Sequence, residues 1–175
     1  MKKVIFFLIF LLFCCNFDDN PPVDEKKEGL LIDTEYRSFL LDSLSKAQKD
    51  VKVMMFAAIY SPGNDYAAND VFITLKALNE NGVNIKLILD KTTASNYPQT
   101  TNFLTQNDID FKLYNSDFSL HSKMVIIDDE ILILGSHNWT EAAFLYNKEV
   151  SFYTTKSEMV ERAKKYFDRL YNEIH

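Results

Sequence analysis

Apolar and polar residues follow one another along this chain in blocks whose spacing predicts an α/β fold. Short or near-continuous apolar runs, typical of strands, occupy residues 51–60, 83–89, 111–114, 123–127, 131–134 and 150–153. Apolar side chains at helical spacing predict helices over residues 35–49, 69–79, 99–106 and 157–174. We therefore expect a layered α/β/α sandwich with a mixed central β-sheet, folded as a single domain.

The amino terminus follows a different pattern. A basic start precedes the apolar run 4–13, which is too short for an ordinary membrane-spanning helix, so residues 1–15 are predicted to be an export signal. Cys14 and Cys15 stand where a lipoprotein signal carries its lipid-modified cysteine. Cys15 fits slightly better, because cleavage before it leaves the small Cys14 at the cut, whereas cleavage before Cys14 leaves the bulky Phe13 there.

Neither cysteine follows the Ala, Gly or Ser that such signals prefer, so an uncleaved membrane anchor and plain secretion stay open as alternatives. Residues 16–32 are polar and contain a Pro-Pro pair and a run of charges, which predicts a tether before a folded domain over residues 33–175. No cysteine follows position 15, so the core must stabilise this domain without disulfides. We expect an exported protein of a bacterial cell envelope, held at the membrane by a lipid anchor or a signal anchor.

The most informative segment of the chain is 120–128, followed six residues later by 135–138. Side chains alternate along a strand, so His121 and Lys123 are expected to point the same way while the apolar run behind them anchors the strand in the core. An imidazole can attack phosphorus, and an ammonium group can hold a nonbridging oxygen. The pair therefore favours phosphodiester cleavage through a covalent phosphohistidine.

The spacing His-x-Lys-x4-Asp-x6-Gly-Ser-x-Asn resembles the signature of the phospholipase D superfamily, with every defined position present. Members of that family usually combine two copies of the motif, one histidine acting as nucleophile and the other as general acid. This chain has one copy, like the small bacterial endonucleases and the mitochondrial cardiolipin hydrolase type that it resembles. The resemblance therefore implies a homodimer, in which a two-fold axis brings two copies of His121 to one phosphate.

The resemblance and the chemistry of the side chains together give the site residues their expected roles. His121 is expected to be the nucleophile or the acid, and Lys123 to be catalytic beside it. Ser136 and Asn138 are expected to bind the phosphate together with Lys123. A cation, a hydroxyl and an amide can stabilise charged phosphoryl oxygens, so neither a metal nor another cofactor is required.

Four further residues near the motif have assigned roles. Glu149 matches the acidic position that in this family hydrogen-bonds the catalytic histidine, although an exposed strand-edge charge is the alternative. Asp128 lies five residues after Lys123, hence on the opposite strand face, which favours a structural role at the following turn. Gly135 is the structural glycine of the motif, and Trp139 is expected to pack beneath the site.

The charge of the chain argues against strong binding of nucleic acid. The formal net charge is -6, and it becomes -8 if the signal is removed with its two lysines. Nucleic-acid-binding proteins usually present a basic face, which a chain of this charge must create locally. Scattered solvated lysines are as good an explanation as a basic rim for the candidates Lys86, Lys91, Lys112 and Lys148.

Three functions remain from the sequence. The first is a metal-independent phosphodiesterase of nucleic acid, similar to an endonuclease. The second is a phospholipase D acting on head groups of phosphatidylcholine or cardiolipin, which a membrane tether would favour. The third is a catalytically idle surface lipoprotein, against which the intact motif speaks.

Overall fold

One mixed sheet of seven strands runs through the computed structural model of the chain, which describes residues 27–63 and 65–174. Its strand order is β1-β7-β6-β5-β2-β3-β4, with β2, β3 and β4 parallel and every other neighbouring pair antiparallel. The strands are β1 (Glu28–Ile32), β2 (Asp50–Met55), β3 (Asn84–Asp90), β4 (Asp110–Tyr114), β5 (Lys123–Ile127), β6 (Ile131–Gly135) and β7 (Val150–Thr154). The predicted mixed α/β sheet is confirmed.

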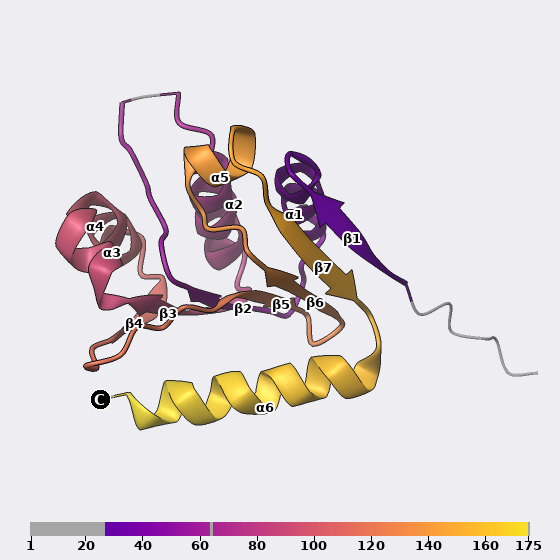
Figure 1. Cartoon of the computed structure of the whole chain (residues 1–175). Helices are drawn as coiled ribbons and strands as arrows, with labels where there is room; N and C mark the ends of the chain where they lie inside the picture. Colours follow the sequence, from indigo (N-terminus) through magenta and orange to yellow (C-terminus); the bar gives the residue numbers. More distant parts are fainter. Residues whose placement is uncertain (1–26, 64, 175) are drawn as a thin grey trace, which may run out of the picture.

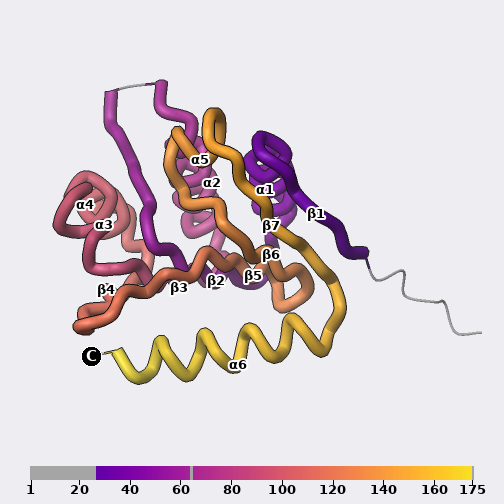
Figure 2. The backbone as a smooth tube through the Cα atoms, viewed as in Figure 1, coloured from indigo at the N-terminus to yellow at the C-terminus, as the bar shows by residue number. Residues whose placement is uncertain are grey.

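Helices cover both faces of this sheet (Figure 1). They are α1 (Glu35–Ser45), α2 (Asn69–Glu80), α3 (Lys91–Asn96), α4 (Pro98–Gln106), α5 (Glu141–Leu145) and α6 (Ser157–Glu173). Helices α1 to α5 lie on one face, whereas α6 crosses the opposite face and ends below β4 (Figure 2). The sheet thus separates two apolar clusters, a large one beneath α1, α2 and α4 and a smaller one beneath α6.

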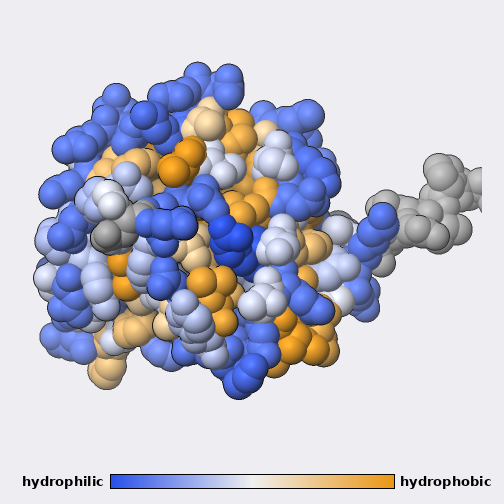
Figure 3. All heavy atoms as spheres, turned by 90° about the horizontal axis from the view of Figure 1, so that it is seen from above, coloured by the Kyte–Doolittle hydropathy of each residue, from blue (hydrophilic) through white to orange (hydrophobic). Residues whose placement is uncertain are grey.

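The two apolar clusters explain why these segments form these elements. In the central strands β2 and β5, alternate apolar residues enter the two clusters, and the buried exceptions are Lys52 and Lys123. Helix α6 is amphipathic and buries Val160, Phe167 and Tyr171 against the sheet, while most of its exposed residues are polar or charged. Viewed from the side of α1 and α2, hydrophilic and hydrophobic side chains form a mosaic over the surface (Figure 3). Among the described helices, none has the length and apolar character needed to cross a membrane.

The largest difference from the sequence prediction lies at the start of the domain. Residues 28–32 were expected to belong to the tether, but they form edge strand β1, which pairs antiparallel with β7. Leu31 of this strand is buried in the large cluster. A short run flanked by charges gives a weak strand signal, and the partner strand lies more than a hundred residues away. The predicted signal, with Cys14 and Cys15, lies outside the described residues.

Two short helices were also missed. No helix was predicted for the segment after β3, but the Asp90 side chain accepts a hydrogen bond from the Thr92 amide and thereby caps α3. Thr140 caps α5 in the same way through the Ala143 amide. Helices of five or six residues have too few turns to show a clear apolar period, so the periodicity of the sequence did not reveal them.

Asp128 holds the turn between β5 and β6 against the loop that precedes β2. Its backbone adopts a positive φ of 56°, a conformation that Asp tolerates better than most residues. Its carboxylate accepts hydrogen bonds from the amides of Gln48 (2.9 Å), Lys49 (2.7 Å) and Asp50 (3.1 Å). This side chain lies at the end of β5 opposite to Lys123, so its hydrogen bonds hold the turn and do not reach the cleft.

Replacing this carboxylate should destabilise the fold. The substitution Asp128→Ala leaves three backbone donors without their acceptor, and we expect the free energy of unfolding to fall by about 1–3 kcal/mol. Asp128→Asn keeps one acceptor oxygen and the tolerance for positive φ, so its free energy of unfolding should fall less than that of Asp128→Ala. Urea denaturation measures both variants, with the exposed Glu130→Gln as a control of similar charge change. An Asp128→Ala protein as stable as the control would contradict this role.

Candidate active site

All motif residues except Asp128 meet at one end of the sheet, where β2 and β6 end and β5 begins. One cleft of about 330 Å³ is lined by residues from two separate segments, namely His121, Lys123, Gly135, Ser136 and Asn138. Strands β5 and β6 are antiparallel neighbours, so the start of one and the end of the other lie side by side. The hairpin therefore brings together residues that are twelve or more positions apart in the sequence.

His121 and Lys123 are in direct contact in this cleft. The Lys123 Nζ atom lies 3.3 Å from His121 Nδ1 and donates a hydrogen bond of 2.9 Å to the His121 carbonyl oxygen. His121 precedes the first residue of β5 and is exposed, whereas Lys123 is buried. The Phe56 ring packs against both, 4.8 Å from the imidazole centroid and 4.9 Å from the Lys123 ammonium. The imidazole is thus accessible, while its neighbouring cation is held in place.

The environment of Lys123 strengthens its electrostatic effect. Burial lowers the pKa of Lys123 below its usual value, and the negative charge of Glu149 partly opposes this change. A partly desolvated ammonium acts through a lower effective dielectric than a solvated one, so its attraction for a phosphoryl oxygen is stronger. The site offers a phosphate one fixed positive charge beside an exposed imidazole.

Glu149 contacts a different partner from the one expected. Within the described chain its carboxylate accepts hydrogen bonds from the Ser136 hydroxyl and, at 3.0 Å, from Asn147 Nδ2. The Ser136 hydroxyl also accepts a bond of 3.0 Å from the Val150 amide. Both residues are therefore near the cleft, but Glu149 orients Ser136 in the single chain and makes no hydrogen bond with His121.

Asn138 and Gly135 complete the wall of the cleft. The Asn138 Oδ1 atom accepts a hydrogen bond of 3.2 Å from the Ala57 amide, which sets the orientation of the side-chain amide and leaves Nδ2 as a donor. At Gly135 a Cβ atom would lie 2.4 Å from the Ser151 Cα atom, closer than any side chain allows. Only glycine permits β6 and β7 to approach this closely beside Ser136.

Asp90 supports the segment that carries His121 from behind, and it was not predicted as a site residue from the sequence. Its carboxylate is buried, caps α3 through Thr92, and accepts a hydrogen bond of 2.7 Å from the Leu120 amide. Leu120 immediately precedes His121, so this bond fixes the backbone from which the imidazole projects. The signal in the sequence was an acidic residue at the end of an apolar strand, a place where α/β proteins often position functional groups.

His137 also lies within the motif, but the structure buries it. Its Nδ1 atom is 2.7 Å from the Ser151 hydroxyl, its Nε2 atom is 2.9 Å from the Asp33 carbonyl oxygen, and Tyr36 stacks on its ring. The carbonyl can only accept, so Nε2 carries the proton and the neutral ring accepts at Nδ1. Trp139 is buried as expected and donates to the Tyr36 hydroxyl. These residues support the motif from the core.

The candidate basic rim is largely engaged elsewhere. The ammonium groups of Lys86 and Lys112 lie over the Tyr171 ring, and Lys112 also donates to carbonyls at the end of α6. Lys91 donates to the Ser116 carbonyl, and Lys148 pairs with Asp33. Across residues 27–63 and 65–174, no three His, Cys, Asp or Glu side chains form a group able to hold a metal ion.

Comparison with known proteins finds a matching family model and distant curated relatives. Residues 40–171 match a family model described as "Cardiolipin synthase, PLD-like domain". Curated relatives called mitochondrial cardiolipin hydrolase are 25% identical over 135 residues in Chlamydomonas reinhardtii and 23% identical over 138 residues in Homo sapiens. These alignments cover 77% and 79% of this chain but 57% and 52% of the relatives, so the chain spans little more than half of their length.

Solved structures share the fold. NucT from Helicobacter pylori superposes with a TM-score of 0.73 at 24% identity, covering 86% of this chain and 98% of that one. Nuc from Salmonella typhimurium, described as a phospholipase D family member, gives 0.73 at 20% identity, covering 86% and 97%. The sheet and its helices therefore match almost the whole of each of these two chains.

The burial of His137 predicts a loss of stability in mild acid. Burial lowers the pKa of His137 below 6.5, so the unfolded chain binds a proton that the folded chain resists. The contribution of the neutral His137 ring to the free energy of unfolding is complete above pH 6.5. It falls as the pH drops below this value, by at most about 1.4 kcal/mol per pH unit. The free energy of unfolding is measured by urea denaturation at neutral pH and again about one unit below pH 6.5. It should fall less between the two pH values for His137→Gln than for the natural chain. Equal losses would show that this ring does not cause the effect.

Proposed function

The chain belongs to the phospholipase D-like family, and from its site we propose that it is a metal-independent phosphodiester hydrolase acting through a phosphohistidine. The observation that carries this proposal is the contact between an exposed His121 and a buried Lys123 in one cleft with Asn138. A nucleophile, a fixed cation and an amide donor are what a phosphodiester needs at its reacting phosphorus.

The proposed reaction has two displacements. The lone pair of one His121 Nε2 atom attacks phosphorus, the bond to the leaving oxygen breaks, and a second imidazole gives that oxygen its proton. The second imidazole, now neutral, takes a proton from water, whose oxygen attacks phosphorus and breaks the P–N bond. Lys123 and Asn138 stabilise the charged oxygens in both steps. No metal is needed for this sequence of steps.

The second imidazole is proposed to come from a second copy of the chain. His137 is buried with both ring nitrogens engaged, so within the described residues His121 is the imidazole that lines the cleft. A two-fold axis through the cleft supplies an identical His121 from the partner. Which imidazole attacks then depends on the direction of the leaving group.

An exposed apolar patch next to the cleft supports this dimer. Ile32 and Val150 are paired across β1 and β7, each is about half exposed, and Val150 directly follows Glu149. Leu30 extends the same face and is 60% exposed. Burial of such side chains by a second copy is favourable in proportion to the apolar area removed from water. The position of this apolar patch beside the cleft fits an interface that also completes the site.

For the substrate we propose nucleic acid first. The resemblance of this single-motif chain to small bacterial endonucleases supports it. A phospholipid such as cardiolipin or phosphatidylcholine is the second candidate, favoured by the names of the curated relatives and by the proposed membrane anchor in residues 1–15. An idle envelope lipoprotein is the third, and the cleft speaks against it because its reactive groups are in contact. We propose that the protein works outside the cytoplasm, anchored at the membrane.

Substitution of the reacting groups tests the mechanism. We expect His121→Asn and Lys123→Ala to lower turnover by about 10³-fold or more, because one removes the nucleophile and the other its charge stabilisation. The purified full chain is incubated in detergent with single-stranded DNA, double-stranded DNA, RNA, and mixed micelles of phosphatidylcholine or cardiolipin, with chelator throughout. Products identify the substrate class, and circular dichroism checks the fold of each variant. Turnover that survives His121→Asn would refute the mechanism.

Mixing the two forms tests the shared site. Natural and His121→Asn chains are mixed in equal amounts and allowed to exchange subunits. If each site needs both imidazoles, mixed dimers are inactive, and about half of the activity of the same amount of natural chain remains. Independent sites would leave that activity undiminished. Sedimentation should show a dimer, and Ile32→Lys, which places a charge in the apolar patch, should give an inactive monomer. An active monomer would disprove the shared site.

A further inference from the structure

A groove of about 750 Å³ runs between α6 and β6, on the face of the sheet that α6 crosses. Its apolar floor comes from Leu132 and Leu134 of β6 and from Met159 of α6. Leu134 immediately precedes Gly135, which lines the cleft that holds His121. The groove therefore approaches the candidate active site along β6, but the two share no lining residue.

Positive charge gathers along this groove. Arg162, Lys165 and Arg169 all line it, although the chain as a whole has a formal net charge of -6. Arg162 and Lys165 form no ion pair or side-chain hydrogen bond with any part of the chain that the structure describes. Arg169 lies 4.0 Å from Glu173, and both side chains are exposed, so that pair is weak. The groove is thus a local basic surface on an acidic protein.

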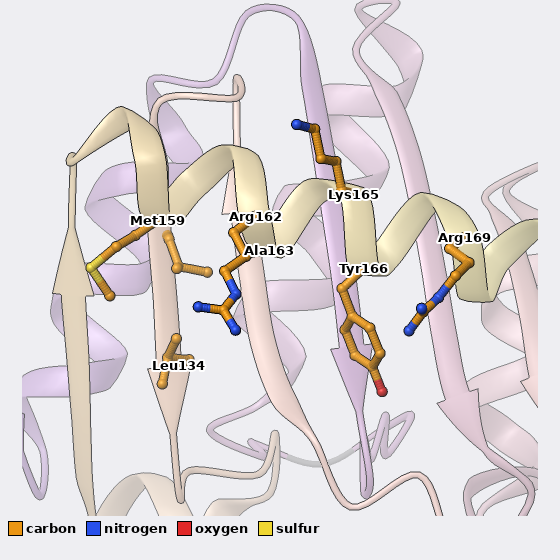
Figure 4. Close-up of a pocket in the computed structure, with 8 residues that line it drawn as sticks. Leu134, Met159, Arg162, Ala163, Lys165, Tyr166 and Arg169 are labelled. Carbon is orange, nitrogen blue, oxygen red and sulfur yellow. The ribbon is translucent and has the colours of Figure 1, made fainter.

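Three of the side chains form a row. Arg162, Tyr166 and Arg169 are spaced at i, i+4 and i+7, which places them on one side of α6 over about 10 Å. Figure 4 shows all three extending from α6 toward the end of the sheet where Leu134 lies, while Lys165 points the other way. The Arg169 guanidinium lies 5.4 Å from the centroid of the Tyr166 ring, which is exposed.

We propose that this row binds the nucleic-acid strand that flanks the scissile phosphate, an inference that rests on the proposed function. The two guanidinium groups would bind backbone phosphates, and the Tyr166 ring would stack on a base between them. Two guanidinium groups, one of them unpaired among the described residues and the other only weakly paired, beside an aromatic ring favour this ligand over a lipid, for which the apolar floor alone would suffice. It also supplies the local basic surface that the net charge does not.

Binding is measured apart from cleavage. In the inactive His121→Asn chain, the affinity for a labelled single-stranded oligonucleotide is measured by fluorescence anisotropy at several salt concentrations. We expect Arg162→Ala, Tyr166→Ala and Arg169→Ala each to weaken binding by about tenfold. Loss of one arginine should also reduce the slope of log K against log salt by about 0.7, whereas Tyr166→Ala should leave that slope unaltered.

Control variants and a small substrate separate the possible outcomes. Lys76→Ala removes one cation from α2, on the other face of the sheet, and should not weaken binding. In the active chain, the arginine variants should lower kcat/KM for the oligonucleotide about tenfold more than for bis(p-nitrophenyl) phosphate, which is too small to reach the groove. If His121→Asn abolishes cleavage but the row variants bind normally, the proposed function stands and this inference fails.

Two other results would also overturn the inference. Binding of the row variants to anionic vesicles of cardiolipin and phosphatidylcholine is also measured. Weaker binding to these vesicles without any change in oligonucleotide affinity would assign the groove to lipid. Conversion of the protein to a monomer by Arg162→Ala or Tyr166→Ala in sedimentation would assign it to the second copy. Oligonucleotide binding that none of the row variants weakens would place the nucleic acid elsewhere on the surface.

Discussion

The contact between the Lys123 ammonium and His121 is the interaction on which the site depends. A buried cation needs a hydrogen-bond acceptor, which the His121 carbonyl oxygen supplies, and the imidazole of the same residue lies 3.3 Å from the ammonium. The rest of that strand is buried among apolar neighbours from β2 and β6, so this end of the strand has little freedom to move. The same packing that stabilises the sheet therefore fixes a charged group beside an exposed imidazole.

Support for this contact comes from both sides of the sheet end. Asp90 holds the residue before His121, while Gly135 allows β7 to come close enough for Glu149 to orient Ser136. The carboxylate of Asp33 in turn accepts a bond from the Glu149 amide, and that bond holds the pKa of Asp33 below its usual value. A chain of neutral and charged hydrogen bonds thus connects the edge strand to the cleft, and each member limits the movement of the next.

An acidic protein can act on a polyanion only if its positive charge is concentrated where the substrate lies. Most of the lysines that the sequence offers as a rim are engaged with Tyr171, a backbone carbonyl or an acidic side chain. The basic row of α6 lies on the same face as the apolar floor beside β6 and approaches the cleft. Proximity to the reacting phosphate matters more than net charge, because salt screens charges that lie more than a Debye length away.

The sequence by itself determined the strands from β2 onward and the long helices, since their apolar periods are carried by many residues, and its motif named the five residues that line the cleft. It did not reveal β1, whose pairing with β7 joins distant segments, nor the role of Asp90, which acts on a residue thirty positions away. It also suggested that Glu149 would bind the histidine, whereas the single chain directs it to Ser136. Spacing along a chain fixes local periodicity and local contacts, but distances between segments arise only when the sheet assembles and its register is set.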